Sequence, residues 1–449
     1  MQMTAGKMIE KQENIIQIKK AFWPMLIVFY ALFVVRDVFA VQFPVFIYLV
    51  WVAVMALYFN DTEIKALLIS FMPLVSGFQS KYAILICMIV LLIKYGKSLR
   101  IPPFIFIILF LMFWEFVHLD GQYSTTAEYL SGFAPLMCLC IIVSLPAKQE
   151  DVTFFSRVLA VSLVVGSLIV LVNTVKSGQQ SIISLVKDGF RLGDLEETES
   201  HQIVYNANGL GSLCNMAIVG LLLNIYVKKT KKIDYFLIVY AILIGCLTVS
   251  RTFLLCLAIT FLLYILLQEK SFAHKLKVLL IIVFLVIVAI VCLKTLAPAI
   301  IDNYVERFNA DDVTGGRSYL LTFYNKFIAS SPERFWYGIG VQNINLKVGD
   351  ITGVTVDVPH NGYQQLIIAW GVFGLFFTML FVLCIVLDAR NKNPHAALMG
   401  YIPLFLVLIN ITAGQFITSG TKLLSLVYIY LVICNMQKER KKSNGNKHY

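Results

Sequence analysis

The amino-acid sequence predicts an all-α polytopic membrane protein, and two observations support this fold class. Hydrophobic residues make up 59% of the 449 residues, and charged residues make up only 14%. In soluble domains, hydrophobic residues make up about 45–50% and charged residues about 25%. The mean hydropathy is +0.79, which leaves too little polar surface to cover a water-soluble particle. A soluble enzyme, a disordered chain and a disulfide scaffold are therefore excluded.

Apolar runs recur along the whole chain. A transmembrane helix needs roughly 20 apolar residues, and several runs are shorter, so we expect about 12–14 transmembrane helices in one transmembrane domain, residues 1–449. The first run is expected to remain as an anchor, because no small-residue cleavage site follows it. The runs lie at residues 21–35, 38–59, 66–78, 82–93, 101–117, 133–145, 152–172, 207–227, 235–249, 253–267, 278–297, 362–387, 398–413 and 421–436.

Lysine and arginine residues gather in alternate connecting segments, and this pattern predicts the orientation of the chain. With the N-terminus inside, most of these residues fall on the cytoplasmic side, and so does most of the net charge of +11. We therefore expect a multi-pass protein of the cytoplasmic (inner) membrane with both termini in the cytoplasm. A basic cytoplasmic face suits anionic headgroups, so membrane lipids are expected partners and nucleic acid is not.

Residues 235–267 are expected to form a hairpin of two helices. The segment is too long for one span at a rise of 1.5 Å per residue. It also lies between two basic loops, residues 228–234 and 268–277, which should share the cytoplasmic side. An even number of crossings is therefore required. The break falls at Ser250-Arg251-Thr252, which places Arg251 at or near the outer surface.

Residues 298–361 form the largest predicted outer loop. A helix is expected within it, because the apolar residues of 317–330 recur at helical spacing and Ser331-Pro332 ends the pattern. Two interpretations remain open and weigh equally: an amphipathic lid over a lateral opening, or a helix packed on the bundle. The residues on its apolar face are Leu320, Leu321, Tyr324, Phe327 and Ile328.

Ionisable residues at a membrane boundary are costly, so each is a candidate site residue. His360 lies where the large outer loop returns to the membrane, and His118 and His201 lie in other outer segments. The nine cysteines sit in apolar runs without metal-ligand spacing. Asp311-Asp312 lacks the spaced Asp-x-Asp arrangement typical of metal-dependent sites for sugar nucleotides. We therefore expect no metal.

Three motifs occur in a fixed order, and together they resemble the O-antigen polymerase and O-antigen ligase superfamily. The resemblance covers roughly residues 191–387. The motifs are Ser250-Arg251-Thr252 at the tip of the hairpin, Gly315-Gly316-Arg317 followed by Tyr337-Gly338-Ile339-Gly340, and His360-Asn361 at the start of a helix with Gly371-Val372-Phe373-Gly374 downstream.

This resemblance implies a GT-C-like fold and a glycosyltransferase whose donor is a polyprenyl-diphosphate-linked saccharide. The reaction would occur outside the cytoplasmic membrane, without nucleotide, metal or other cofactor. Arginine binds phosphate through a planar fork, so Arg251 and Arg317 are the predicted diphosphate ligands, with Arg191 as a third candidate. Histidine titrates near neutrality, so His360 is the predicted general base. Asn361 either orients the substrate or only caps the helix.

Several functions remain open. A polymerase would extend surface polysaccharide, O-antigen or capsule chains, and we favour it because the chain has spans beyond the ligase-like region. A ligase would instead transfer the finished chain to lipid A core. A flippase for lipid-linked oligosaccharides is an alternative from another class, although it should show two related halves. A polymerase would be expected to work with a chain-length regulator and a flippase.

Overall fold

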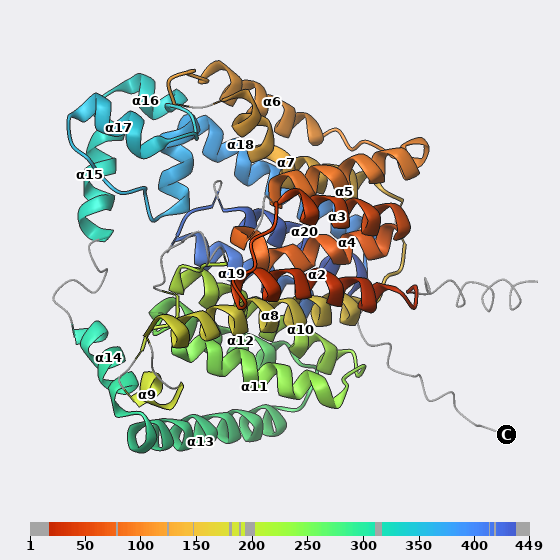
Figure 1. The fold of residues 1–449 in the computed structure, drawn as a ribbon, viewed down its shortest axis with the longest axis vertical. Coiled ribbons are helices and arrows are strands. Elements are labelled where there is room, and N and C mark those ends of the chain that lie inside the picture. Colours follow the sequence, from red (N-terminus) through yellow and green to blue (C-terminus); the bar gives the residue numbers. More distant parts are fainter. Residues whose placement is uncertain are drawn as a thin grey trace, which may run out of the picture.

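The computed structural model describes residues 18–77, 80–123, 125–146, 148–178, 182–187, 190–193, 203–309, 317–412, 414–416 and 419–436. These residues form helices and no β-strand, which confirms the all-α class (Figure 1). The helices up to residue 226 are α2 (Phe22–Asp37), α3 (Phe46–Tyr58), α4 (Asp61–Phe71), α5 (Ser80–Tyr95), α6 (Ile105–Val117), α7 (Thr126–Ser144), α8 (Val152–Gly178), α9 (Ile182–Lys187) and α10 (Ala207–Tyr226).

The remaining helices include those of the predicted hairpin and of the large loop. They are α11 (Lys232–Leu247), α12 (Arg251–Leu267), α13 (Phe272–Leu296), α14 (Pro298–Asn309), α15 (Arg317–Ala329), α16 (Pro332–Tyr337), α17 (Ile344–Thr352), α18 (Gly362–Lys392), α19 (Ile402–Ile411) and α20 (Gly420–Asn435). In the described ranges, short 3-10 helices join them at η2 (Met72–Gly77), η3 (Gly96–Ser98) and η4 (Leu398–Tyr401).

Every predicted apolar segment coincides with a helix, and the segment at residues 66–78 is shared between α4 and η2. Four of the described helices, α7, α8, α10 and α18, are long and apolar enough to cross a membrane. Others, including α3, α6, α12 and α20, are apolar but shorter. The polytopic class is thus confirmed, whereas the number of 12–14 spans stays a prediction.

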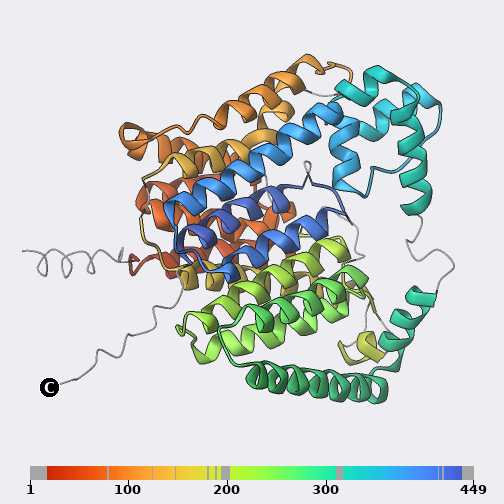
Figure 2. The same cartoon turned by 180° about the vertical axis from the view of Figure 1, so that it is seen from behind.

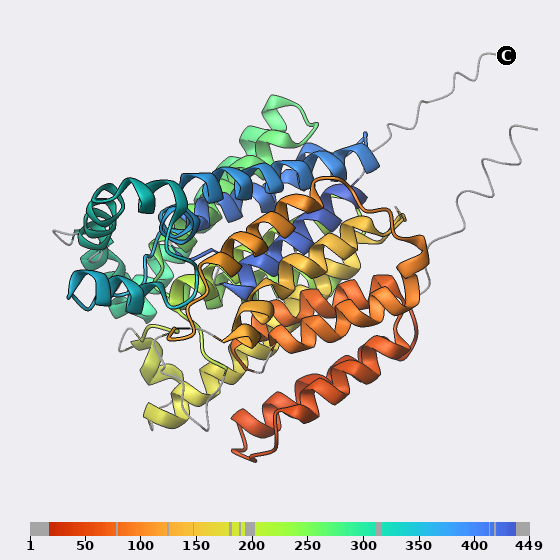
Figure 3. The same ribbon diagram turned by 90° about the horizontal axis from the view of Figure 1, so that it is seen from above.

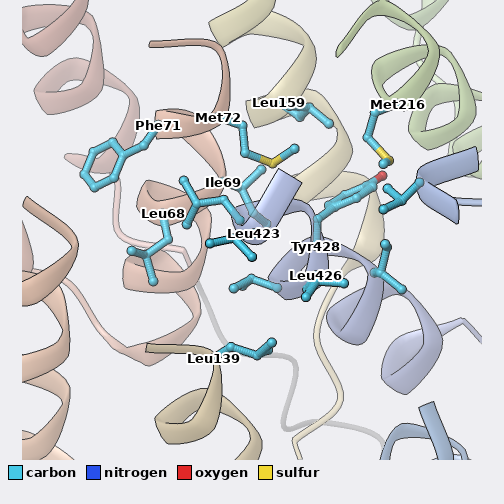
Figure 4. Close-up of a cluster of buried hydrophobic side chains, with 14 of the residues drawn as sticks. Leu68, Ile69, Phe71, Met72, Leu139, Leu159, Met216, Leu423, Leu426 and Tyr428 are labelled. Carbon is cyan, nitrogen blue, oxygen red and sulfur yellow. The ribbon is translucent and has the colours of Figure 1, made fainter. Parts of the chain in front are cut away.

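The centre of the bundle lies where α4, α7, α8, α10 and α20 meet (Figure 4). Leu68, Leu159 and Tyr428 come from three of these helices and are all fully buried. By contrast, α13 lies along the edge of the bundle (Figures 1 and 2). Many of its leucine, isoleucine and valine side chains are exposed. An exposed apolar face of this kind is expected for a helix that contacts lipid.

Segments that the charge pattern assigned to the cytoplasm lie together at one end of the bundle. Three ion pairs join them across long sequence separations, which supports the prediction that they share one side of the membrane, and a fourth lies within α18. We call this region the paired end. Its ion pairs are Lys65 Nζ to Glu150 Oε1 at 2.8 Å, Lys148 Nζ to Asp61 Oδ1 at 3.0 Å, Arg157 Nε to Asp234 Oδ1 at 2.8 Å and Lys392 Nζ to Asp388 Oδ2 at 3.2 Å.

The described parts of the large loop, residues 298–309 and 317–361, contain α14, α15, α16 and α17, which lie along the left side of the bundle in Figure 1 and also project from it in Figure 3. The prediction of one helix here was incomplete, since four are present. The predicted helix itself is confirmed as α15, and Ser331 caps the next helix where α15 was expected to stop. Tyr324 and Phe327 of α15 are buried, which supports the packed interpretation for this half of the helix.

Candidate active site

A cavity of two chambers lies between the hairpin, α15 and the start of α18. The larger chamber has a volume of about 680 Å³, and we call it the apolar chamber because leucine side chains form much of its wall. The smaller, or polar, chamber has a volume of about 240 Å³. Thr252, Arg317 and His360 line both chambers, and Arg251 lines the apolar one. Three predicted site residues from three motifs therefore meet at one cavity.

The hairpin break positions Arg251 as the first residue of α12. The structure confirms the predicted break: α11 ends at Leu247, and Ser250 caps α12 by accepting a hydrogen bond from the backbone N–H of Phe253 at 3.3 Å. The Ser250 hydroxyl also donates to Asn208 Oδ1 at 2.7 Å. Asn208 lies in the first turn of α10, so this bond ties α10 to the hairpin break. Its neighbour Asn206 caps α10 by accepting a hydrogen bond from the N–H of Asn208.

The broken end of α11 is bound by donors from two outer segments. The last carbonyl groups of a helix lack partners within it and carry partial negative charge, so they attract donors and cations. This network attaches α14 and residues 190–193 to the hairpin. The bonds run from Tyr304 Oη to the Cys246 carbonyl (3.0 Å), from the Leu192 N–H to Leu247 (2.8 Å), from Arg191 Nε to Thr248 (3.2 Å) and from Arg307 Nη1 to Val249 (2.8 Å).

Arg191 and Arg307 thus help to hold the site together. Arg191 is not among the residues that line either chamber, so its predicted contact with diphosphate stays a prediction. Arg307 was missed by the sequence analysis, because it lies outside the three motifs. Its carbonyl accepts a hydrogen bond from Arg251 Nη1 at 2.6 Å, which fixes the direction of the Arg251 side chain.

Positive charge is concentrated around Arg317. Burial lowers the pKa of its guanidinium, and repulsion from Arg251, Arg191 and Arg307 lowers that pKa further. A guanidinium remains charged in proteins in spite of such shifts. The four arginines therefore create a field at the cavity that would favour a polyvalent anion.

His360 lies immediately before the start of α18. Burial lowers the pKa of its imidazole below the ordinary value, and the positive charge of Arg317 adds to this effect, while Asp357 opposes it. The neutral form, which can accept a proton, is therefore favoured near neutral pH. Asn361 is the cap of α18, since its Oδ1 accepts from the N–H groups of Tyr363 and Gln364. It also lines the apolar chamber, so both of its predicted roles fit its position.

The glycines of two motifs explain how the loop approaches α18. Gly371 interrupts α18 with φ +70°, and Gly338 has φ +80°. A Cβ atom at Gly371 would lie 2.0 Å from the Trp336 carbonyl oxygen. The turn is further held by a hydrogen bond of 2.9 Å from the Ile339 N–H to the Ile368 carbonyl. Only glycine permits such close contact together with this backbone conformation.

A buried carboxylate fastens the same turn, and the sequence analysis missed it. Glu115 of α6 is fully buried, and its two oxygens accept from the N–H of Val341 at 2.8 and 3.0 Å. One of them also accepts from Trp370 Nε1 at 2.7 Å. Lys347 lies nearby and donates to the Ile339 carbonyl at 2.9 Å. An acidic residue inside an apolar run was the available signal.

Lys422 is a third residue that the sequence analysis missed, after Arg307 and Glu115. It belongs to α20, lines the polar chamber, and donates to the carbonyl of Asn410 at 3.1 Å. His201, Gly315-Gly316 and Asp311-Asp312 lie outside the described residues. Among the residues that are described, no three His, Cys, Asp or Glu side chains gather closely enough to hold a metal ion.

Comparison with known proteins supports the reading of these motifs. A search of curated proteins finds no match to the chain. Residues 236–379, less than half of the chain, match the family model described as O-antigen ligase. The matched segment includes Arg251, Arg317 and His360, whereas Arg191 and Lys422 lie outside it. Members of this family are glycosyl-transferring enzymes. The resemblance is therefore confirmed: residues 236–379 of this chain match the O-antigen ligase and polymerase superfamily.

Proposed function

We propose that this protein is a glycosyltransferase that polymerises polyprenyl-diphosphate-linked oligosaccharide units at the outer side of the cytoplasmic membrane. The observation that carries this proposal is the meeting of Arg251, Arg317 and His360 around one cavity with an apolar wall. A lipid-linked diphosphate has an apolar chain, two phosphates and a sugar, and the cavity offers a matching surface for each part.

The apolar chamber suits the polyprenyl chain. Leu254, Leu255, Leu320 and Leu321 form part of its wall. Arg251 and Arg317 stand beside these leucines. In this arrangement a diphosphate next to the lipid chain would meet both guanidinium groups, each of which can bind phosphate oxygens in a bidentate manner.

The reaction requires one bond to form and one to break at the anomeric carbon. A hydroxyl of the acceptor saccharide attacks this carbon, and His360 takes the hydroxyl proton. The bond from the carbon to the diphosphate oxygen breaks, and the lipid diphosphate leaves with the bonding electrons. The arginines stabilise the charge that accumulates on the leaving group. The donor's own diphosphate bond supplies the driving force, so this scheme uses no nucleotide or metal.

A polymerase and a ligase would share this chemistry and differ in the acceptor. The match to the O-antigen ligase model is compatible with both. We favour the polymerase, because apolar helices continue on both sides of the matched segment. The ligase, which would transfer the chain to lipid A core, remains the second candidate within this enzyme class.

The proposed orientation places the paired end in the cytoplasm and the cavity outside. Cysteines introduced at Lys228 and Lys326, both exposed positions, test this assignment in a cysteine-free background. A membrane-impermeant thiol reagent added to intact cells should label position 326 and leave position 228 unlabelled. The reverse pattern would contradict the location of the site.

The function itself is tested with purified protein and a polyprenyl-diphosphate-linked saccharide. Chains of several repeat units should form, with release of polyprenyl diphosphate, and EDTA should leave the rate unchanged. Transfer to lipid A core without chain growth would favour the ligase. Movement of the lipid-linked saccharide across the membrane without any glycosyl transfer would point instead to a flippase.

A further inference from the structure

The polar chamber contains a lysine that the proposed reaction does not use. Lys422 reaches this chamber from α20 and does not line the apolar chamber. Its ammonium group donates a hydrogen bond to a neutral acceptor, the Asn410 carbonyl. Within the described part of the chain, no ion pair involves Lys422, Arg251 or Arg317.

Two other lysines of the bundle, Lys65 and Lys392, have acidic partners. Lys65, which is 4% exposed, lies 2.8 Å from Glu150. Lys392 lies 3.2 Å from Asp388. A cation removed from bulk water normally needs such a partner, because its desolvation is unfavourable. Lys347 also bonds to backbone carbonyls without an ion pair, but the negative charges of Glu115 and Asp120 act on it. The charge that acts on Lys422 is the positive one of Arg317, so a negatively charged ligand would supply what the described side chains around Lys422 do not.

The remaining wall of the polar chamber suits a saccharide. Amide and hydroxyl side chains dominate it, and these groups form hydrogen bonds with sugar hydroxyls in either direction. No described carboxylate lines either chamber. The amide and hydroxyl residues include Asn206, Asn208, Ser212, Asn410, Gln415 and Ser419.

We propose that the polar chamber binds an acidic saccharide, and that Lys422 pairs with a carboxylate on one of its sugars. This inference rests on the proposed function, because it assigns a substrate class to the same cavity. The saccharide would extend from the wall shared by Arg317 and His360 into the polar chamber. The ammonium of Lys422 would then select units that carry a uronic acid over neutral ones.

The donor diphosphate is the other anion that could reach this lysine, and the geometry favours the saccharide. Arg251 and Arg317 stand beside the leucines that would hold the lipid chain, so the diphosphate belongs on their side of the cavity. Lys422 lines the polar chamber together with Arg317, and it lines no part of the apolar chamber, where Arg251 and the leucines lie. A single ammonium also matches the single charge of a carboxylate.

The test uses the native lipid-linked saccharide, isolated from cells that lack this protein. One portion of the preparation is left intact, and in a second portion the sugar carboxylates are reduced to primary alcohols. We expect the wild-type kcat/KM to be at least about tenfold higher for the intact form, the size of a charged hydrogen bond. Lys422→Met should abolish this preference through a higher KM, and Lys422→Arg should retain part of it. Lys326→Met, an exposed lysine at the same end, is the matched control.

Several outcomes would overturn this inference while leaving the proposed function intact. One is a native saccharide without any carboxylate. Another is a wild-type enzyme that uses both forms equally well. A third is an equal loss on both forms in Lys422→Met, which would assign the lysine to the diphosphate or to folding. Failure of the wild-type protein to transfer any lipid-linked saccharide would instead refute the proposed function, and this inference with it.

Discussion

The paired end and the cavity of this bundle differ in whether their cationic side chains have acidic partners. At the paired end, Lys65 and Lys148 are satisfied by Glu150 and Asp61. At the cavity, Arg251 and Arg317 line a common wall without a described carboxylate beside them. Both ends lie next to largely apolar helices, so the unfavourable desolvation of a charge applies to both. Only the paired end offsets it within the described part of the chain.

This difference separates structural charges from functional ones. A closed ion-pair network stabilises the ends of helices and leaves little for a ligand to gain. A group of unpaired cations makes the empty site unfavourable and makes binding of an anion favourable. The cavity therefore resembles other sites in which stability is given up for recognition, whereas the paired end contributes to the fold.

The largest expected effect separates two histidines at the cavity end. His360→Ala should lower kcat by about 10²–10⁴-fold, because a general base contributes that much. The folded protein should remain stable, since His360 caps no helix. His118→Ala is the matched control: its ring bonds to the Trp114 carbonyl and it lines neither chamber. Full activity of His360→Ala in steady-state assays would contradict the role of His360 as the general base.

A smaller effect is expected at the paired end, and it should appear in stability. Lys65→Met leaves Glu150 buried without its partner and should reduce the free energy of unfolding by about 3–5 kcal/mol. The double variant Lys65→Met/Glu150→Gln should recover much of this loss, because no charge is left unpaired. Thermal unfolding in detergent measures both. Equal stability of Lys65→Met and the wild type would contradict the claim that the ion pairs of the paired end stabilise the fold.

The smallest effect concerns the pH dependence of the reaction. Because the pKa of His360 is lowered, its active neutral form should persist on acidification, and activity should fall only below the ordinary histidine range of about 6.5. Asp357 raises that pKa, so Asp357→Asn should move the acid limb of kcat/KM to still lower pH. Since Asp357 is exposed, a shift of a few tenths of a pH unit is expected. A shift to higher pH would contradict the assigned base.

Much of the fold was predictable because the signals are local in sequence. The break at Ser250-Arg251-Thr252 followed from span length and the flanking basic loops, and α15 followed from its apolar spacing. Arg251, Arg317 and His360 were predicted as site residues from three motifs, and all three line one cavity.

The residues that sequence analysis missed depend on distant partners. Glu115 acquires its role from Val341, more than two hundred positions away. Arg307 acquires its role from the carbonyl of Val249 at the end of α11. Lys422 is informative only beside Arg317, which reaches the same chamber from another helix. No local sequence pattern encodes contacts between such distant residues, so they become visible only in the folded structure.

The most direct test of the central claim measures binding of a lipid diphosphate to the unpaired arginines. Polyprenyl diphosphate should raise the unfolding temperature of the wild-type protein, because a ligand that binds only the folded state stabilises it. The increase should vanish in Arg317→Met, whose ligand-free stability should equal or exceed that of the wild type. It should persist in Arg334→Met, a nearby arginine that lines neither chamber. An equal increase in Arg317→Met and the wild type would contradict the claim that these cations form the diphosphate site.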